Sequence, residues 1–192
     1  MKRIKIISFF LSILILSNCG IIIITPPAQW EKVDDFKVSP NTRPSELIKK
    51  YLGKNLVNDR NNYCITFFDI YCTPCYTQIN YCNQLYEETK ENFDWFSVTI
   101  YDSVAESKFR KKLEYPDDYL RYNFPTFYNI NGLKSSLRNL YYNNMITKSD
   151  YVPMTIIIAN DTIKFINDGA INSQEKYIAH KSFLDSLSQI YK

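Results

Sequence analysis

The chain has 192 residues, which is enough for a single domain with its own core. Its 23 basic and 20 acidic residues give a formal net charge of +3, and three of the basic residues, Lys2, Arg3 and Lys5, lie before Cys19. The rest of the chain is therefore formally neutral and has no basic stripe. This charge balance gives no electrostatic reason to expect that the protein binds nucleic acid.

The N-terminus has the pattern of an export signal. Its basic residues precede an apolar run, Ile6–Leu16, that only serines interrupt. The segment Leu16–Gly20 (LSNCG) resembles a bacterial lipobox with Cys19 as the lipidated residue. We therefore expect a signal peptide over residues 1–19 and a lipid-anchored protein in the cell envelope, facing the periplasm or the exterior. Two alternatives remain open: Ile21–Ile24 extends the run to the length of an uncleaved membrane anchor, or the chain is simply secreted.

Residues 20–60 are expected to form a spacer before the main domain. The stretch Thr25–Pro44 contains prolines and scattered charge, which favours an extended segment that holds the domain away from the membrane. An alternative is an N-terminal extension that packs on the domain through Trp30 and Phe36. The main domain is predicted over residues 61–192.

Two cysteines two residues apart, in Cys72-Thr73-Pro74-Cys75, form the most informative motif of the chain. They follow the apolar run Tyr63–Ile70, which predicts a buried strand, and precede a stretch with helical spacing. At such a junction the first cysteine lies at a helix N-terminus, where the dipole and free backbone N–H groups favour a thiolate. The second lies about one helical turn further on, close enough to close a disulfide ring. This geometry is typical of dithiol–disulfide exchange.

The rest of the sequence alternates strand and helix patterns. The segment Phe124–Tyr142 is aromatic, contains proline and glycine, and indicates no clear secondary structure. The other predicted strands are Phe93–Tyr101, Met154–Ala159 and Thr162–Ile166. The predicted helices are Pro44–Leu52, Asp102 to about Leu113, and a final helix that begins near Asn172. Thr42 or Ser45 is expected to cap the first of these helices, and Glu175 is expected to be the capping partner in the last. This order predicts an α/β fold in which helices cover both faces of a mixed sheet.

The order of these elements resembles the thioredoxin fold: a strand, the CxxC motif and a helix, then a strand, an X-Pro pair directly before a strand, a hairpin and a closing helix. The signal-like N-terminus and a middle insertion make the chain similar to the TlpA/ResA group of extracytoplasmic thiol–disulfide oxidoreductases. The resemblance covers about Asn61–Lys192, and Phe67–Cys75 (FFDIYCTPC) matches the family's strand end and active-site loop. A helical insertion before the cis-proline strand corresponds to about Asp102–Tyr151.

The resemblance also implies roles for individual residues. Cys72 takes the place of the attacking cysteine and Cys75 that of the resolving one. Val152 and Pro153 take the place of the cis-proline pair that faces the dithiol. The residues expected to contact a substrate are Tyr71, Thr73, Pro74, Val152 and Pro153.

Three positions depart from the family pattern. Tyr71 precedes the first cysteine, where tryptophan is usual. The positions at which the family carries a buried acid hold Thr66 on the strand and Gln78 on the helix. Such an acid accepts the proton of the buried cysteine, so its absence predicts slower deprotonation of Cys75 or a different acid. Asp69 is the nearest candidate in the sequence, and we interpret it as a solvated acid of the loop.

The function expected from the motif and the resemblance is that of a membrane-tethered thiol–disulfide oxidoreductase. It would reduce or exchange disulfides in extracytoplasmic partner proteins, and an upstream protein would donate or accept the electrons. No cofactor is expected beyond the Cys72–Cys75 disulfide. No metal is expected either, because Cys64 and Cys82 lack the paired spacing of zinc ligands. Cys82 is expected to be a buried free thiol, with a Cys64–Cys82 disulfide as the alternative.

Three alternatives to this function stay open. A non-catalytic surface lipoprotein that uses a thioredoxin-like scaffold as a binding module also accounts for the missing tryptophan and acids. The CxxC pair could be a static structural disulfide in an exported domain. A thioredoxin-like peroxidase is less favoured, because a peroxidatic cysteine needs no CxxC partner. An exposed, acidic Cys72 separates an active enzyme from a scaffold whose cysteine is buried and inert.

Overall fold

The computed structural model describes residues 37–53, 61–112, 121–143 and 152–191. The predicted signal peptide, the lipobox residue Cys19 and the proposed anchors Trp30 and Phe36 lie outside the described residues. Within the described ranges, none of the helices has the length and apolar character that a bilayer span requires.

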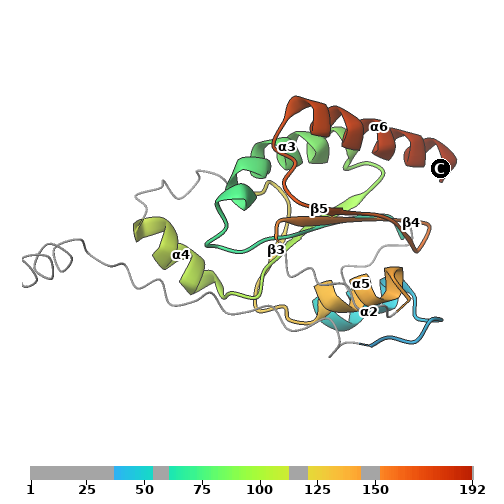
Figure 1. The fold of residues 1–192 in the computed structure, drawn as a ribbon, viewed down its shortest axis with the longest axis horizontal. Helices are drawn as coiled ribbons and strands as arrows, with labels where there is room; N and C mark the ends of the chain where they lie inside the picture. The colour runs from blue at the N-terminus through green and yellow to red at the C-terminus, as the bar shows by residue number, and fades with distance from the viewer. Residues whose placement is uncertain (1–36, 54–60, 113–120, 144–151, 192) are drawn as a thin grey trace, which may run out of the picture.

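A five-stranded mixed sheet in the order β3-β2-β1-β4-β5 forms the centre of the fold (Figure 1). Its strands are β1 (Tyr63–Phe67), β2 (Asp94–Val98), β3 (Thr126–Phe127), β4 (Met154–Ala159) and β5 (Thr162–Asp168). β2 lies parallel to both β1 and β3, whereas β4 lies antiparallel to both β1 and β5. Asn160 and Asp161, both with positive φ, form the tight turn between β4 and β5.

Helices cover both faces of this sheet (Figure 1). One face carries α3 (Thr73–Thr89) and α6 (Gln174–Ile190), the other carries α2 (Pro44–Leu52) and α5 (Leu133–Tyr141), and α4 (Ser103–Lys112) lies to one side near the start of α3. Successive side chains of a strand point to opposite faces, so β1 supplies both cores. Ile65 packs in the cluster that contains α2 and α5, and Cys64 packs in the cluster that contains α3 and α6.

This architecture confirms the predicted α/β, thioredoxin-like fold class. Every expected piece is present: a strand that leads into the CxxC motif and a helix, a parallel second strand, an X-Pro pair before β4, a hairpin and a closing helix. The connection between β2 and β4 is not purely helical, because it holds the short edge strand β3 as well as α4 and α5. The domain boundary at residue 61 stays a prediction.

The N-terminal helix α2 has the predicted bounds but not the predicted cap. Neither Thr42 nor Ser45 caps it, because Arg43 is the N-cap residue and Ser45 lies inside the first turn. The backbone N–H and the hydroxyl of Ser45 instead both donate to the carboxylate of Asp161, at 2.8 Å each. The part of the predicted spacer that the structure describes therefore packs on the domain, and Ile48 is fully buried there.

The segment Phe124–Tyr142, for which the sequence indicated no structure, contains β3 and α5. β3 is two residues long, too short to show an alternating pattern. Many polar residues of α5 are buried, which hides the apolar spacing of Leu133 and Leu137. At the start of α6 the predicted capping role of Glu175 is wrong, because the hydroxyl of Ser173 accepts the N–H of the first turn.

Candidate functional site

The CxxC motif lies between β1 and α3, at the junction that the sequence predicts. Cys72 is the N-cap residue of α3 and forms a disulfide with Cys75, with a Cα–Cα distance of 5.2 Å. The backbone N–H of Cys75 donates to the Sγ atom of Cys72 at 3.1 Å. The helix N-terminus thus directs a donor and the positive end of its dipole at this sulfur. Both stabilise a thiolate once the disulfide is reduced.

The two sulfurs differ in exposure. Cys75 is 1% exposed and packs against Phe68 and Ile70, whereas Cys72 is half-buried. Cys72 is therefore the more accessible of the two cysteines. This asymmetry is what a pair made of an attacking and a resolving cysteine requires.

The predicted partner-facing residues surround Cys72. A cis peptide bond joins Val152 to Pro153 directly before β4, and the carbonyl oxygen of Val152 lies 3.5 Å from the Sγ atom of Cys72. Thr73 and Pro74 are exposed at the start of α3. The structure therefore brings together residues that are about 80 positions apart in the sequence, and it leaves the motif's tip open to solvent.

Tyr71, which directly precedes Cys72, ties the motif to α4. Its ring packs edge-on against Phe109 and Tyr101, at centroid distances of 4.7 Å and 5.4 Å. The residue is 37% exposed, so part of it remains available to a partner. An aromatic ring at this position thus both supports the loop and offers contact area.

Asp69 is buried, so its interpretation as a solvated loop acid is wrong. The side chain is 7% exposed, and its carboxylate accepts the backbone N–H of Tyr71 at 2.7 Å and the hydroxyl of Tyr101 at 3.4 Å. Burial raises the pKa of Asp69, while these two hydrogen bonds and the charge of Lys134 partly oppose the rise. The Asp69 carbonyl also accepts the N–H of Cys72 at 3.1 Å, so this residue fixes the turn that presents the motif.

The side chains of Thr66 and Gln78 are neutral and hydrogen-bonded. Gln78 is fully buried; its amide donates to the Tyr122 hydroxyl at 3.1 Å and accepts the N–H of Ile171 at 3.4 Å. Thr66 lies 3.4 Å, hydroxyl to hydroxyl, from Thr155 on the neighbouring strand. Neither side chain is an acid that can take the proton of the buried cysteine.

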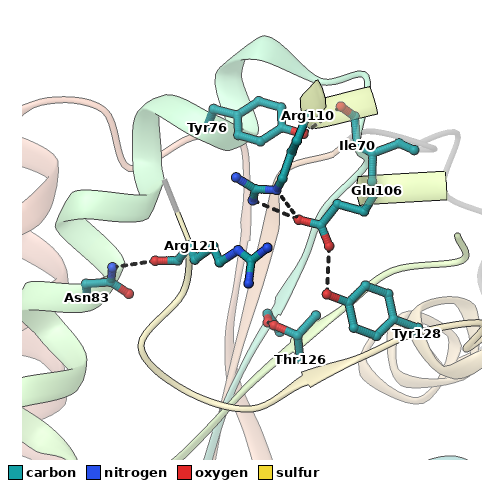
Figure 2. A network of polar contacts seen from close by, with 9 residues as sticks. Ile70, Tyr76, Asn83, Glu106, Arg110, Arg121, Thr126 and Tyr128 are labelled. Atoms are coloured by element: carbon teal, nitrogen blue, oxygen red, sulfur yellow. Dashed lines mark hydrogen bonds and ion pairs between the residues drawn. The ribbon is translucent and has the colours of Figure 1, made fainter. Parts of the chain in front are cut away.

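A cavity of about 180 Å³ lies next to Cys75, which lines it. Glu106 on α4 is an acid that also lines this cavity, and it is 7% exposed. Figure 2 shows its carboxylate between Arg110 and Tyr128. Sequence analysis missed Glu106 and Arg110. Their spacing of four residues on a predicted helix indicates that they can form an ion pair. It does not indicate that this pair faces the CxxC motif.

Cys64 and Cys82 are both free and fully buried, so the prediction of a buried free thiol at Cys82 is confirmed and the alternative Cys64–Cys82 disulfide is not formed. Burial raises the pKa of both thiols, that of Cys82 to about 12. Both are therefore inert at neutral pH. No group of three or more metal-ligating side chains occurs in the ranges that the structure describes.

No protein-family model and no curated protein matches the chain. Solved structures give distant likenesses. A protein from Chlorobium tepidum, described as a candidate thiol:disulfide interchange protein DsbE, is 17% identical over 66% of this chain and 80% of its own, with a TM-score of 0.46. A secreted disulfide oxidoreductase from Mycobacterium tuberculosis is 10% identical over 66% and 81%, with a TM-score of 0.42. A thioredoxin-related protein from Neisseria meningitidis serogroup B is 12% identical over 67% and 88%, with a TM-score of 0.47.

At these values the likenesses carry no inference about activity. The strand order and the CxxC pair at the start of α3 nevertheless define the fold by themselves. The protein has a thioredoxin-like fold with a CxxC disulfide between β1 and the N-terminus of α3.

Proposed function

We propose that the protein is an extracytoplasmic thiol–disulfide oxidoreductase that reduces or exchanges disulfides in partner proteins. One observation carries the proposal: a half-buried Cys72 at the N-terminus of α3, paired with a buried Cys75 and facing the Val152–Pro153 bond. A static structural disulfide needs neither the donor aimed at the outer sulfur nor the difference in exposure between the two sulfurs.

The reaction follows from that geometry. The thiolate of Cys72 attacks one sulfur of a partner disulfide, so that a mixed disulfide forms and the partner's other sulfur leaves as a thiolate. The thiolate of Cys75 then attacks the Sγ atom of Cys72 and releases the partner's second sulfur. Two electrons pass to the partner and the Cys72–Cys75 disulfide remains. An upstream dithiol protein restores the reduced pair by the reverse exchange.

Substrate contacts are assigned to the residues around the outer sulfur. Val152 offers a backbone carbonyl beside Cys72, and Pro153 offers no N–H, so an extended partner segment can lie along this loop. Thr73 and Pro74 at the tip and the exposed part of Tyr71 complete the contact surface. These roles rest on position and exposure.

Attachment to the membrane is a further part of the proposal. The signal-like N-terminus supports lipidation at Cys19 and a location in the cell envelope. Cys19→Ala should move the protein from the membrane fraction to the soluble fraction. An unchanged distribution would favour the uncleaved anchor.

The decisive experiment measures the reactivity and the redox equilibrium of the two cysteines. Full-length protein is alkylated over a range of pH and equilibrated in a glutathione redox series. We expect a pKa for Cys72 below that of an ordinary thiol and a reversible Cys72–Cys75 couple. Cys72→Ser should abolish exchange, and Cys75→Ser should trap a mixed disulfide with the partner. A pair that stays oxidised or unreactive under all conditions would leave a binding module with a structural disulfide.

A further inference from the structure

The cavity beside the disulfide has one apolar and one charged wall. Phe68, Ile79 and Tyr122 line the apolar wall next to Cys75. At about 180 Å³ the cavity far exceeds the roughly 10–15 Å³ that one water requires, so it has room for a side chain. Tyr122 also packs against the cluster that contains Cys75, so the cavity lies beside the buried half of the disulfide.

The charged wall is built around a desolvated ion pair. The Nε and Nη2 atoms of Arg110 donate to one oxygen of Glu106 at 2.8 Å and 2.7 Å, and the Tyr128 hydroxyl donates to the other oxygen at 2.7 Å (Figure 2). The guanidinium of Arg110 also lies over the ring of Tyr76, 5.7 Å from its centroid. Glu106 is thereby fully engaged, and its charge is balanced by that of Arg110.

A second guanidinium faces the same space. Figure 2 shows the side chain of Arg121 reaching toward Glu106 and Arg110, and Arg121 lines the cavity. Its backbone is held in place, since its carbonyl accepts the amide of Asn83 at 2.8 Å. Its guanidinium forms no hydrogen bond or ion pair with any described residue. Among the described residues that line the cavity, two guanidinium groups therefore stand against one carboxylate, an excess of one positive charge.

We propose that this cavity is a specificity pocket that receives an acidic side chain of the partner protein, close to the cysteine that reacts with Cys72. The proposal rests on the proposed function and names the substrate class of the same site. A guanidinium binds a carboxylate through a planar pair of hydrogen bonds, and Arg121 has this fork unused. The apolar wall suits the methylene groups of the same side chain. The excess charge disfavours a basic partner.

The test compares two disulfide-bonded peptides that differ only in one residue near the cysteine, glutamate or glutamine, in a short series of positions. Reduced full-length protein is mixed with each, and the rate constant of exchange is measured at low and high salt. We expect the best glutamate peptide to react about tenfold faster than its glutamine counterpart, because charge-assisted hydrogen bonds are the strong ones. Salt should reduce this preference. Arg121→Gln should abolish it, and Arg43→Gln, which removes an exposed charge at the N-cap of α2, should keep it.

The outcomes separate the two proposals. Equal rates for all peptides in the unmodified protein would overturn the pocket and leave the exchange reaction standing. If no peptide reacts, the proposed exchange reaction is refuted. The pocket is then tested by a measurement of peptide binding. Calorimetry with a glutamate peptide whose cysteines are replaced by serine should then show saturable binding that Arg121→Gln removes. Absence of that binding would overturn the pocket as well.

Discussion

The ion pair between Glu106 and Arg110 is buried, so a change to one partner should be costly. Their side chains are 9% and 3% exposed, and three hydrogen bonds converge on the carboxylate. Glu106→Gln keeps the shape and one acceptor oxygen but leaves the charge of Arg110 without its counter-charge. Breaking a buried pair in this way costs about 3–5 kcal/mol. We expect a loss of about 3 kcal/mol in the free energy of unfolding, because glutamine retains part of the hydrogen bonding.

Urea denaturation of the oxidised protein, followed by circular dichroism, measures this loss. The double variant Glu106→Gln with Arg110→Met should recover much of it, since no uncompensated charge then remains. A matched control is Asp185→Asn, which breaks the exposed pair with Lys181 at the same spacing of four residues. That control should be indistinguishable from the unmodified protein. A loss below about 1 kcal/mol for Glu106→Gln would refute the claim that this pair is desolvated.

Three further predictions concern other parts of the molecule. Burial raises the pKa of Asp69 above its unfolded value, so the folded state holds this proton more tightly and stability falls as pH rises through that window. Asp69→Asn should reduce the fall in the free energy of unfolding, measured by urea denaturation from about pH 4 to 7. The same dependence on pH in the variant and the unmodified protein would contradict this prediction. Cys64 and Cys82 should resist iodoacetamide at pH 8 until urea is added, as peptide mass spectrometry would show; labelling in native buffer would contradict their burial. Ser45→Ala should cost about 1.5 kcal/mol in the same denaturation assay, through the lost hydrogen bond to Asp161, and an unchanged midpoint would mean that α2 does not dock there.

The parts of the fold that the sequence predicts are those with short-range signals. The strand Tyr63–Phe67, the CxxC junction and the β4–β5 hairpin each carry an apolar run or turn residues within a few positions. α5 carries the signal too, because Gly132 precedes Leu133 and Leu137 at helical spacing, but buried polar residues between them obscure it. The spacing of apolar residues reports the local preference of the chain for helix or strand. Whether a polar side chain is buried depends on the tertiary packing, which this spacing does not report.

In the candidate site, too, only the residues with a local sequence signal could be predicted. Cys72 and Cys75 could be identified because their chemistry depends on residues next to them in the chain. The placement of Glu106 beside Cys75 depends on how α4 returns toward the start of α3, and no periodicity encodes that. The burial of Asp69 was misjudged for a related reason, because aromatic rings from distant segments, such as Tyr101, cover it.

The redox pair and the wall beside it come from separate stretches of chain. Cys72 and Cys75 belong to the junction of β1 and α3, whereas Glu106, Arg110 and Arg121 belong to the connection between β2 and β3. Mutations in that connection can alter the charge and shape beside the disulfide while the helix end that governs sulfur reactivity stays unchanged. Partner choice can therefore diversify, by evolution or by engineering, on a constant electron-transfer unit.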